Sequence, residues 1–426
     1  YAICFGLPFL LLDVFWPTGF PEAGYVNAVI LPVRDGIGAP NAMVLVLAGI
    51  GAFVAVFISL RGVLESRMVG FGFGVQLSPG PFRVLAYAML AGYMAQEFIP
   101  AIRDLPSIGH VLDRIGYVAF AVFFAAGQMR VIRKAEVWAV FGVGLPMVVM
   151  HKLFTSLMTP VILFGLLLFI LCWPVYKKRA IVILGASALC AALFYFPAQE
   201  FRAQIGLPQF KSSAANESLV GKISFFGRIS AAVWAKDTEI EFENRTYALT
   251  GAGALTAFGR RIFLMPLFNH VYAKTPEPVP YWGGETYRNF FTNLVPRAFW
   301  AGKPEERFGR EFGIRYGLVS QDDHSSVNVP WIIELLANFG AVGVIAGMAV
   351  IGFLFAVIDR FFNSKTVTPI ERAVGIGLMF RWAYPESNFT VMCGDLLPLT
   401  VACYIYFRFG SKWLAPVFGK HAETPP

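Results

Sequence analysis

Long apolar runs separated by short polar segments dominate the chain. Runs near twenty residues with few charges are long enough to cross a bilayer as α-helices, whereas the strands of a β-barrel would alternate. We therefore predict an all-α, polytopic transmembrane helix bundle of about ten or more spans. The predicted spans are 1–16, 41–60, 83–100, 115–129, 136–154, 157–175, 180–198, 332–358, 370–384 and 389–408.

One long polar interruption divides this pattern into three parts. Residues 1–198 are predicted as an N-terminal transmembrane bundle, and residues 332–426 as C-terminal transmembrane helices with a short cytoplasmic tail. Between them, residues 199–331 form one large, helical extramembrane loop. This loop is where we expect the active site.

Two amphipathic helices are predicted inside this loop. Apolar residues recur at helical spacing over 214–236, which favours a helix lying on the membrane surface or docked across the spans. A second helix, over about 247–273 by the same spacing, would carry Arg260, Arg261 and His270. Neighbouring residues on one helix face are three or four apart, so Arg260 and Arg261 point in different directions.

Composition supports a membrane protein. Hydrophobic residues make up 57% of the chain, charged residues 15%, and the mean hydropathy is +0.61. In soluble domains about a quarter of all residues are charged. The chain begins with Tyr1 rather than Met, so we expect its natural N-terminus to lie upstream. The five cysteines all fall in apolar runs, and no His/Cys spacing matches a metal site, so neither a metal nor a cofactor is predicted.

The distribution of positive charge predicts the topology. Net charge is +8, and basic clusters follow alternate predicted spans. By the positive-inside rule the clusters face the cytoplasm. Residues 199–331 then face the periplasm of a bacterial inner membrane. Nucleic acid is not expected as a partner, because no basic helix or stacking platform stands outside this membrane pattern.

The stretch from Gly259 to Trp331 concentrates the candidate chemistry. So many cations beside a bilayer predict a polyanionic substrate, namely a lipid-linked phosphate or pyrophosphate. The cations are Arg260, Arg261, Lys274, Arg288, Arg297, Lys303, Arg307, Arg310 and Arg315.

Arg297 is the first of these that we assign to the substrate. The preceding proline fixes the local backbone, and the neighbouring Phe299 and Trp300 suit the membrane interface. This holds a guanidinium at the height of a lipid pyrophosphate, with Lys303 six residues on. The alternative interpretation is that Arg297 and Lys303 only anchor the loop at the interface.

Polar residues around the start of span 332–358 are the second group. Asp323 and His324 lie just before the span, where a carboxylate or imidazole could take a proton from a sugar hydroxyl. A surface histidine is the alternative. Glu334 and Asn338 lie one turn apart inside the apolar run, where polar groups face a cavity or a partner helix. Substrate contact and helix-packing hydrogen bonds both remain open for this pair.

Three sequence pieces over about 283–345 resemble the bacterial O-antigen (Wzy-type) and related oligosaccharide repeat-unit polymerases. They are G-x-T-Y in GGETYRNFFTNLVPRAFWAGKP, (I/V)PR-x-x-W-x-x-KP in the same stretch, and E-x-x-x-NFG-x-x-G in SSVNVPWIIELLANFGAVGVIAG. The resemblance implies a GT-C-like, metal-independent glycosyltransferase that acts on undecaprenyl-pyrophosphate-linked oligosaccharides. It assigns Arg297, and with less support Arg260 or Arg261, to the pyrophosphate.

The predicted site follows from these pieces together. The catalytic residues are Asp323, His324 and Arg297. The substrate-binding residues are Arg260, Arg261, Tyr287, Arg288, Lys303, Glu334 and Asn338. Expected partners are membrane lipids, a co-polymerase that regulates chain length and a flippase.

Two other functions stay open. O-antigen ligases share the expected fold and carry a catalytic histidine before the corresponding span. Asn328 occupies that place here and His324 lies one turn earlier, which counts against a ligase. A transporter of lipid-linked sugars is the alternative from another class. It would place charges in the bilayer middle and show repeated halves, and the sequence shows neither.

Overall fold

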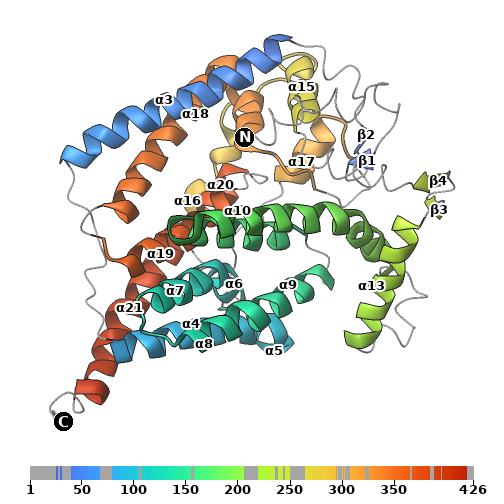
Figure 1. The fold of residues 1–426 in the computed structure, drawn as a ribbon. Helices are drawn as coiled ribbons and strands as arrows, with labels where there is room; N and C mark the ends of the chain where they lie inside the picture. The colour runs from blue at the N-terminus through green and yellow to red at the C-terminus, as the bar shows by residue number, and fades with distance from the viewer. Residues whose placement is uncertain are drawn as a thin grey trace. The chain divides into compact units, whose positions relative to one another are not determined.

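The computed structural model describes helices and a few short strands (Figure 1). The described residues are 25–26, 29–30, 40–67, 79–103, 105, 108–154, 158–205, 219–235, 238–242, 245–249, 264–293, 295, 300, 302, 308–321, 326–364, 367–383, 388–394 and 396–419. They belong to two compact units, which we describe separately. The first unit comprises Ala28–Val137 and Met265–Pro426, and the second comprises Ala2–Asn27 and Trp138–Leu264.

The first unit contains most of the helices. Its helices are α3 (Pro40–Arg67), α4 (Pro79–Phe98), α5 (Pro100–Arg103), α6 (Ile108–Arg114), α7 (Gly116–Gln128), α15 (Met265–Lys274), α16 (Phe290–Asn293), α17 (Phe308–Arg315), α18 (Trp331–Asn363), α19 (Pro369–Met379), α20 (Phe389–Gly394) and α21 (Leu396–Gly419). Two 3₁₀ turns, η3 (Glu285–Tyr287) and η4 (Phe380–Ala383), lie between them.

The remaining elements are fewer. Helix α8 (Lys134–Ala139) continues through the π-helical segment η2 (Val140–Gly144) into α9 (Leu145–Phe154). They are followed by α10 (Met158–Ile205), α13 (Leu219–Trp234), β3 (Thr238–Phe242) and β4 (Arg245–Leu249). Two-residue strands, β1 (Tyr25–Val26) and β2 (Val29–Ile30), precede all of these.

Helices α3 and α18 lie side by side in the first unit (Figure 1). Gly352 allows close approach of the two backbones, because a Cβ there would lie only 2.5 Å from the carbonyl oxygen of Phe53. Small residues at such contacts are typical of helices packed in membranes. Arg61 Nε lies 3.2 Å from Asp359 Oδ2, so the C-terminal ends of the two helices meet.

Helix α18 turns back on itself at Gly340. This residue has φ 67° and ψ −153°, a region that glycine alone occupies readily. The rings of Trp331 and Phe355 consequently lie 6.1 Å apart. In a straight helix these residues would be about 36 Å apart. The first arm, from Trp331 to Phe339, is buried up to Asn338, and the second arm packs along α3.

Helices α4, α7, α19 and α21 complete the packing of the first unit. The Tyr406 hydroxyl donates a hydrogen bond of 2.6 Å to the Leu85 carbonyl, and Gly410 brings α21 against the same leucine. A Cβ on Gly377 would lie 2.4 Å from the Cα of Val118, so α19 and α7 are also in backbone contact.

The sequence TPIE explains where α19 begins. The Thr368 hydroxyl accepts a hydrogen bond from the Glu371 amide, and the Glu371 carboxylate accepts one from the Thr368 amide. This capping box satisfies two backbone donors that a helix leaves unpaired at its start. Pro369 at the first helical position adds a fixed φ that suits the helix.

In the second unit, α13 packs its apolar face against α9 and α10. Phe226, Ile229 and Val233 are buried in one cluster with Phe201. The Trp234 indole donates a hydrogen bond of 3.1 Å to the Leu193 carbonyl. The amphipathic helix predicted over 214–236 is confirmed for 219–234, and it is docked on other helices.

The second helix, predicted over 247–273, is wrong at its beginning. Residues 245–249 form β4, which pairs antiparallel with β3. Thr246 and Tyr247 suit a strand better than a helix, and in β3 Glu239 and Glu241 alternate with Ile240 and Phe242. The described helix in this region, α15, begins at Met265 and carries His270.

The structure confirms an all-α protein with helices that can cross a membrane. Among the described residues, four helical stretches are long and apolar enough: Asn41–Leu64, Lys134–Leu153, Trp331–Asn363 and Phe389–Leu414. These indicate a multi-pass membrane protein and correspond to four of the predicted spans. Predicted span 1–16 lies outside the described residues.

The prediction of about ten or more spans is therefore wrong for the described part of the chain. Helices α7 and α19 have 13 and 11 residues. At 1.5 Å per residue they are shorter than the roughly 30 Å of a bilayer core. The predicted spans 157–175 and 180–198 correspond to the two arms of α10, which turns at Tyr176 (φ −128°, ψ 49°), close to Pro174. The arms lie against each other, because a Cβ on Gly165 would be only 2.4 Å from the Cβ of Ser187.

Candidate functional site

The loop that contains G-x-T-Y docks on the first arm of α18. The Trp282 amide donates to the Ala337 carbonyl at 3.1 Å, and the Gly283 amide donates to the Asn338 carbonyl at 3.2 Å. These carbonyls are near the end of the arm, where the reversal at Gly340 leaves them without helical donors. The loop thus satisfies the backbone of the turn that it covers.

Asn338 joins the loop to the helix through its side chain. Its Oδ1 accepts a hydrogen bond of 2.9 Å from the Gly284 amide. Its Nδ2 donates to Thr286 Oγ1 at 2.9 Å and to the Glu334 carbonyl at 2.8 Å. The side chain is 1% exposed, so these bonds are shielded from water. Asn338 therefore holds the G-x-T-Y loop in place.

Glu334 connects the same arm to α20. Its Oε2 accepts a hydrogen bond of 2.7 Å from the Phe389 amide, at the first residue of α20. A carboxylate at a helix start satisfies an otherwise unpaired amide. Thr390 Oγ1 donates to the Thr286 carbonyl at 3.1 Å. Loop, α18 arm and α20 thus form one hydrogen-bonded assembly, which we call the loop latch: Thr286, Glu334, Asn338 and Thr390.

Aromatic rings pack beside the loop latch. The Tyr287 and Phe339 rings are stacked, with centroids 6.1 Å apart and planes 6° from parallel. Phe389 lies edge-on to Tyr287 at 6.2 Å and stacks on Phe290 at 6.0 Å. These contacts orient Tyr287, a predicted substrate-binding residue, through its ring.

Glycines of the motifs have identifiable roles here. Gly284 has φ 91°, and a Cβ there would lie 3.2 Å from the Phe339 ring. A Cβ on Gly340 would lie 2.6 Å from the Tyr281 hydroxyl. A Cβ on Gly343 would lie 2.8 Å from the Leu335 carbonyl oxygen. The motif glycines therefore permit the turn of α18 and the close approach of its two arms.

His270 and several cations of the polar stretch form hydrogen bonds with backbone carbonyls. His270 Nε2 lies 2.9 Å from the Tyr316 carbonyl oxygen, and Lys274 Nζ donates to the same oxygen at 2.8 Å. Arg310 donates to the Gln321 carbonyl at 2.7 Å. Backbone carbonyls in irregular segments need such donors. These side chains stabilise the stretch after α17.

Arg315 supports the other side of the loop. Its guanidinium lies over the Trp282 ring at 4.3 Å and donates to the Pro280 carbonyl at 2.8 Å. Such a cation–π contact combines charge and packing. Arg315 thus fixes the residues that enter the G-x-T-Y loop, rather than facing solvent alone.

Arg288 differs from these cations. It is exposed, and within the part of the chain that the structure describes its guanidinium has no hydrogen-bond or ion-pair partner. Exposed aromatic side chains, Tyr281, Phe291 and Phe339, lie in the same loop and at the α18 turn. Aromatic belts of this kind are typical of a membrane–water interface.

The surroundings of His270 and Tyr316 shift their ionisation. Burial lowers the pKa of His270 below its usual value; the Lys274 ammonium also lowers it, and the bond to the Tyr316 carbonyl opposes the shift. Burial raises the pKa of the Tyr316 phenol, against its hydrogen bond to Thr275. A neutral His270 donates from Nε2 to the carbonyl, which fixes its tautomer.

The structure describes four of the predicted site residues, Tyr287, Arg288, Glu334 and Asn338, and it brings them together around the loop latch. The other predicted residues lie outside the described residues: Arg260, Arg261, Arg297, Lys303, Asp323 and His324. Among the described residues, no group of three His, Cys, Asp or Glu side chains is placed to hold a metal.

Sequence reasoning missed Thr286 and Thr390 as members of the loop latch. Both are buried polar residues. The position of Thr286 within G-x-T-Y was a signal that could have identified it. Thr390 had no comparable signal, because only the fold brings α20 beside the loop.

Residues 82–363 match the family described as "Domain of unknown function (DUF8712)". The match covers well over half of the chain and includes most of α4, the G-x-T-Y loop and both arms of α18. No curated protein and no solved structure matches the chain. The chain therefore belongs to the DUF8712 family.

Proposed function

We propose that this protein is an integral-membrane glycosyltransferase that joins lipid-linked oligosaccharide repeat units. The donor is a glycan on undecaprenyl pyrophosphate, and the acceptor is a second lipid-linked unit. The bundle would be GT-C-like, and the site would face the periplasm of a bacterial inner membrane. The resemblance to Wzy-type polymerases is the source of this substrate class.

One observation carries the proposal. Two of the three sequence pieces behind the resemblance, G-x-T-Y and E-x-x-x-NFG-x-x-G, meet in the loop latch although about fifty residues separate them. The third piece, residues 295–304, lies between them in the sequence. Convergence of separate motifs supports a shared site more strongly than their order in the chain does.

Arg288 supports an anionic substrate at this place. It directly follows the buried Thr286 and the stacked Tyr287, so its backbone is fixed while its guanidinium is exposed. A phosphate site is pre-organised when the backbone is rigid and the cation is available to the ligand. The neighbouring exposed aromatics suit a substrate that is anchored in lipid.

The reaction needs no oxidant or metal in this proposal. The acceptor hydroxyl oxygen attacks the anomeric carbon of the donor, and the bond from that carbon to the pyrophosphate oxygen breaks. The hydroxyl proton passes to a base, for which Asp323 or His324 is the candidate. The pyrophosphate leaves on its lipid, and cations stabilise its developing charge.

The cations that were predicted to bind the substrate would act in that step. Arg288, Arg297 and Lys303 would bind the pyrophosphate, together with Arg260 or Arg261. Glu334 and Asn338 would act as positioning residues, because the loop latch uses their side chains to hold the loop. In this proposal the cations contact the substrate, and Glu334 and Asn338 hold the loop in position.

The test uses cells in which the chromosomal gene is replaced by variants of the full chain. Arg288→Ala should lower the amount of long polymer about tenfold to a hundredfold, the effect of losing one charge-assisted phosphate contact. Arg297→Ala should abolish polymer and leave single repeat units. Arg228→Ala, an exposed arginine of α13, is the matched control and should leave polymer length unchanged.

Product analysis separates the rival functions. Loss of a ligase would leave long chains on undecaprenyl pyrophosphate, and loss of a transporter would trap single units on the cytoplasmic face. Normal chain length in the Arg297→Ala variant, at wild-type protein level, would refute the proposal.

A further inference from the structure

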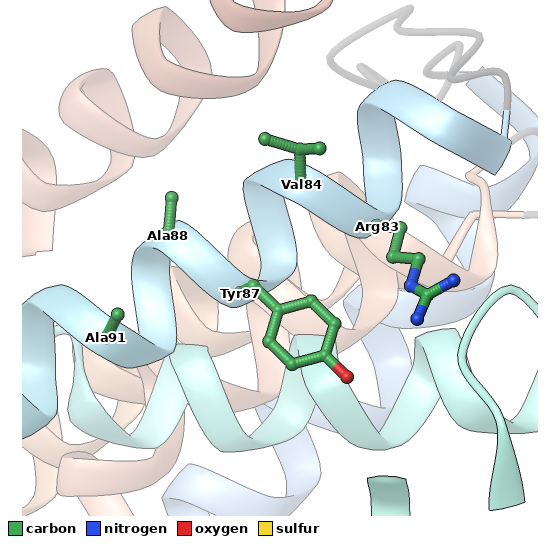
Figure 2. A pocket seen from close by; sticks show the side chains of 5 residues that line it. All are labelled: Arg83, Val84, Tyr87, Ala88 and Ala91. Atoms are coloured by element: carbon green, nitrogen blue, oxygen red, sulfur yellow. The ribbon is translucent and has the colours of Figure 1, made fainter.

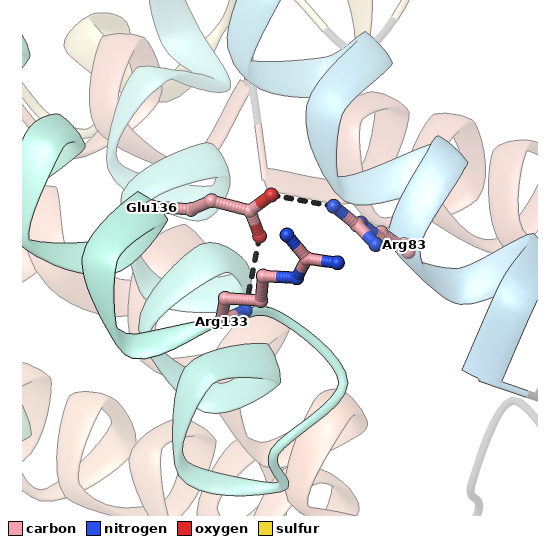
Figure 3. A network of polar contacts seen from close by, with 3 residues as sticks. All are labelled: Arg83, Arg133 and Glu136. Atoms are coloured by element: carbon pink, nitrogen blue, oxygen red, sulfur yellow. Dashed lines mark hydrogen bonds and ion pairs between the residues drawn. The ribbon is translucent and has the colours of Figure 1, made fainter.

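Two arginines of the first unit, Arg83 and Arg133, lie beside the carboxylate of Glu136 (Figure 3). Arg83 of α4 forms an ion pair with Glu136 of α8. The other carboxylate oxygen of Glu136 accepts a hydrogen bond of 2.9 Å from the Arg133 amide. The Arg133 side chain extends toward Arg83, so both guanidiniums gather around Glu136.

This arrangement leaves an excess of positive charge. Glu136 can neutralise only one of the two guanidiniums. Arg130 and Lys134 are exposed close by in the chain. Two neighbouring guanidiniums repel each other, and an added phosphate between them would remove that repulsion while accepting hydrogen bonds from both.

An apolar groove begins at the same arginine (Figure 2). It has a volume of about 510 Å³ and is lined by Arg83, Val84, Tyr87, Ala88 and Ala91. These residues recur at helical spacing, so they form one face of α4. The alanines make the floor shallow, and Val84, Ala88 and Ala91 are exposed. The groove is therefore charged at one end and apolar along its length.

The position of the groove fits a membrane surface. Leu85, two residues after Arg83, contacts Tyr406 and Gly410 of α21. Arg408 lies between those two residues in the chain, and Lys412 follows. The charged end of the groove is thus level with the part of α21 that carries Arg408 and Lys412. Clusters of Lys and Arg next to a membrane span attract anionic headgroups.

We propose that this groove binds an anionic phospholipid. The phosphate lies between Arg83 and Arg133, and one acyl chain lies along Val84, Ala88 and Ala91. A free phosphate would use the cations but not the apolar floor. A zwitterionic lipid would use the floor, but its own ammonium group would oppose the cations. The groove is independent of the proposed glycosyltransferase site.

Thermal unfolding of the purified full chain in detergent tests the proposal. Short-chain phosphatidylglycerol is titrated against phosphatidylcholine with the same acyl chains, and against glycerol phosphate. We expect phosphatidylglycerol to raise the unfolding temperature by several degrees in a saturable manner, since a ligand at a hundred times its Kd adds about 2.7 kcal/mol. The other two compounds should have little effect.

Variants assign the effect to the groove. Arg133→Gln should weaken phosphatidylglycerol binding at least tenfold without breaking the Arg83–Glu136 ion pair. Ala88→Phe should weaken it similarly by filling the groove. Arg61→Gln, an arginine at another helix end, and Ala48→Phe, an exposed position on α3, are the matched controls and should bind as wild type.

Three outcomes would overturn the proposal. They are an equal response to phosphatidylcholine, a full response to glycerol phosphate alone, and equal loss in the Arg61→Gln control. The first would show that binding does not depend on the charge of the headgroup. The second would show that the acyl chains are not needed. The third would show that the effect depends on surface charge in general and not on this groove.

Discussion

Asn338 makes two side-chain hydrogen bonds to the G-x-T-Y loop and a third to its own helix. Its amide bonds Gly284, Thr286 and the Glu334 carbonyl inside a buried region. Each such bond contributes about 1 kcal/mol, and a buried donor or acceptor that loses its partner costs about 1–3 kcal/mol. The loop should therefore depend on this residue.

Replacing this amide gives the first prediction. Asn338→Ala should lower the free energy of unfolding by about 2–4 kcal/mol. Asn363→Ala, which removes an exposed hydrogen bond to Asp359 at the other end of the same helix, should cost less than about 0.5 kcal/mol. Denaturant unfolding in detergent measures both. Equal losses would mean that Asn338 does not hold the loop.

His270 gives a prediction for pH. Its pKa is lowered by burial and by Lys274, so the folded protein resists protonation of this imidazole. Below the unfolded pKa of about 6.5 the unfolded chain binds more protons than the folded one, and stability falls as pH falls. The His270 contribution is thus intact above about pH 6.5 and declines below it.

Melting temperature between pH 8 and 5 should show this decline. The pH range is set by the ordinary histidine pKa of about 6.5. In His270→Gln, which cannot titrate at this position, the melting temperature should change less with pH below about pH 6.5. In the control His151→Gln, the melting temperature should depend on pH as in the wild type. A wild-type slope in His270→Gln would show that another group titrates.

At the scale of elements, α18 is the decisive one, because its reversal at Gly340 creates the surface on which the loop docks. Gly340→Ala introduces both an unfavourable backbone conformation and a contact with Tyr281. We expect a loss of about 2–4 kcal/mol. Gly51→Ala on α3, where a Cβ meets no atom within 4 Å, is the control and should be neutral or slightly stabilising.

A double variant separates the two causes. Adding Tyr281→Ala to Gly340→Ala should recover the steric part and leave the backbone part. Full recovery would show that the backbone conformation is not strained, and no recovery would show that the Tyr281 contact is unimportant. Unfolding free energies in the same detergent decide between them.

The elements also show how far the sequence could be interpreted. Apolar periodicity was sufficient for α13, because burial of one helix face leaves a local pattern, and an apolar run of spanning length was sufficient for α3. It merged the two arms of α18, since an apolar run does not record a reversal at one glycine. It also overcounted spans, because short buried helices such as α7 and α19 are as apolar as spanning ones.

The candidate site was only partly predictable for the same reason. Glu334 and Asn338 stood out as polar residues in an apolar run, but their partners lie far away in the sequence. Thr390 and Phe389 join the site through the fold alone. The sequence also could not separate the cations that bind backbone carbonyls from those that are available to a substrate. Lys274 and Arg315 bind carbonyls, which depends on where the chain returns.

At the scale of the whole molecule, the membrane topology can be tested by labelling. Arg288 and Lys412 are both exposed, and the candidate span Phe389–Leu414 separates them, because Phe389 contacts Tyr287 at its start and Lys412 lies near its end. Single cysteines at these positions, in a chain whose own cysteines are replaced, should react with an impermeant maleimide from opposite faces. A cysteine at Arg61 should match Lys412. Labelling of Arg288 and Lys412 from the same face would contradict the topology.

The most direct test of the central claim is polymerisation by the purified protein. The full chain is reconstituted in liposomes with lipid-linked repeat units extracted from cells that lack it. We predict a ladder of products, with one undecaprenyl pyrophosphate released for each unit added, and loss of both in Arg297→Ala. Units that stay single, with no pyrophosphate carrier released by the wild-type protein, would contradict the account.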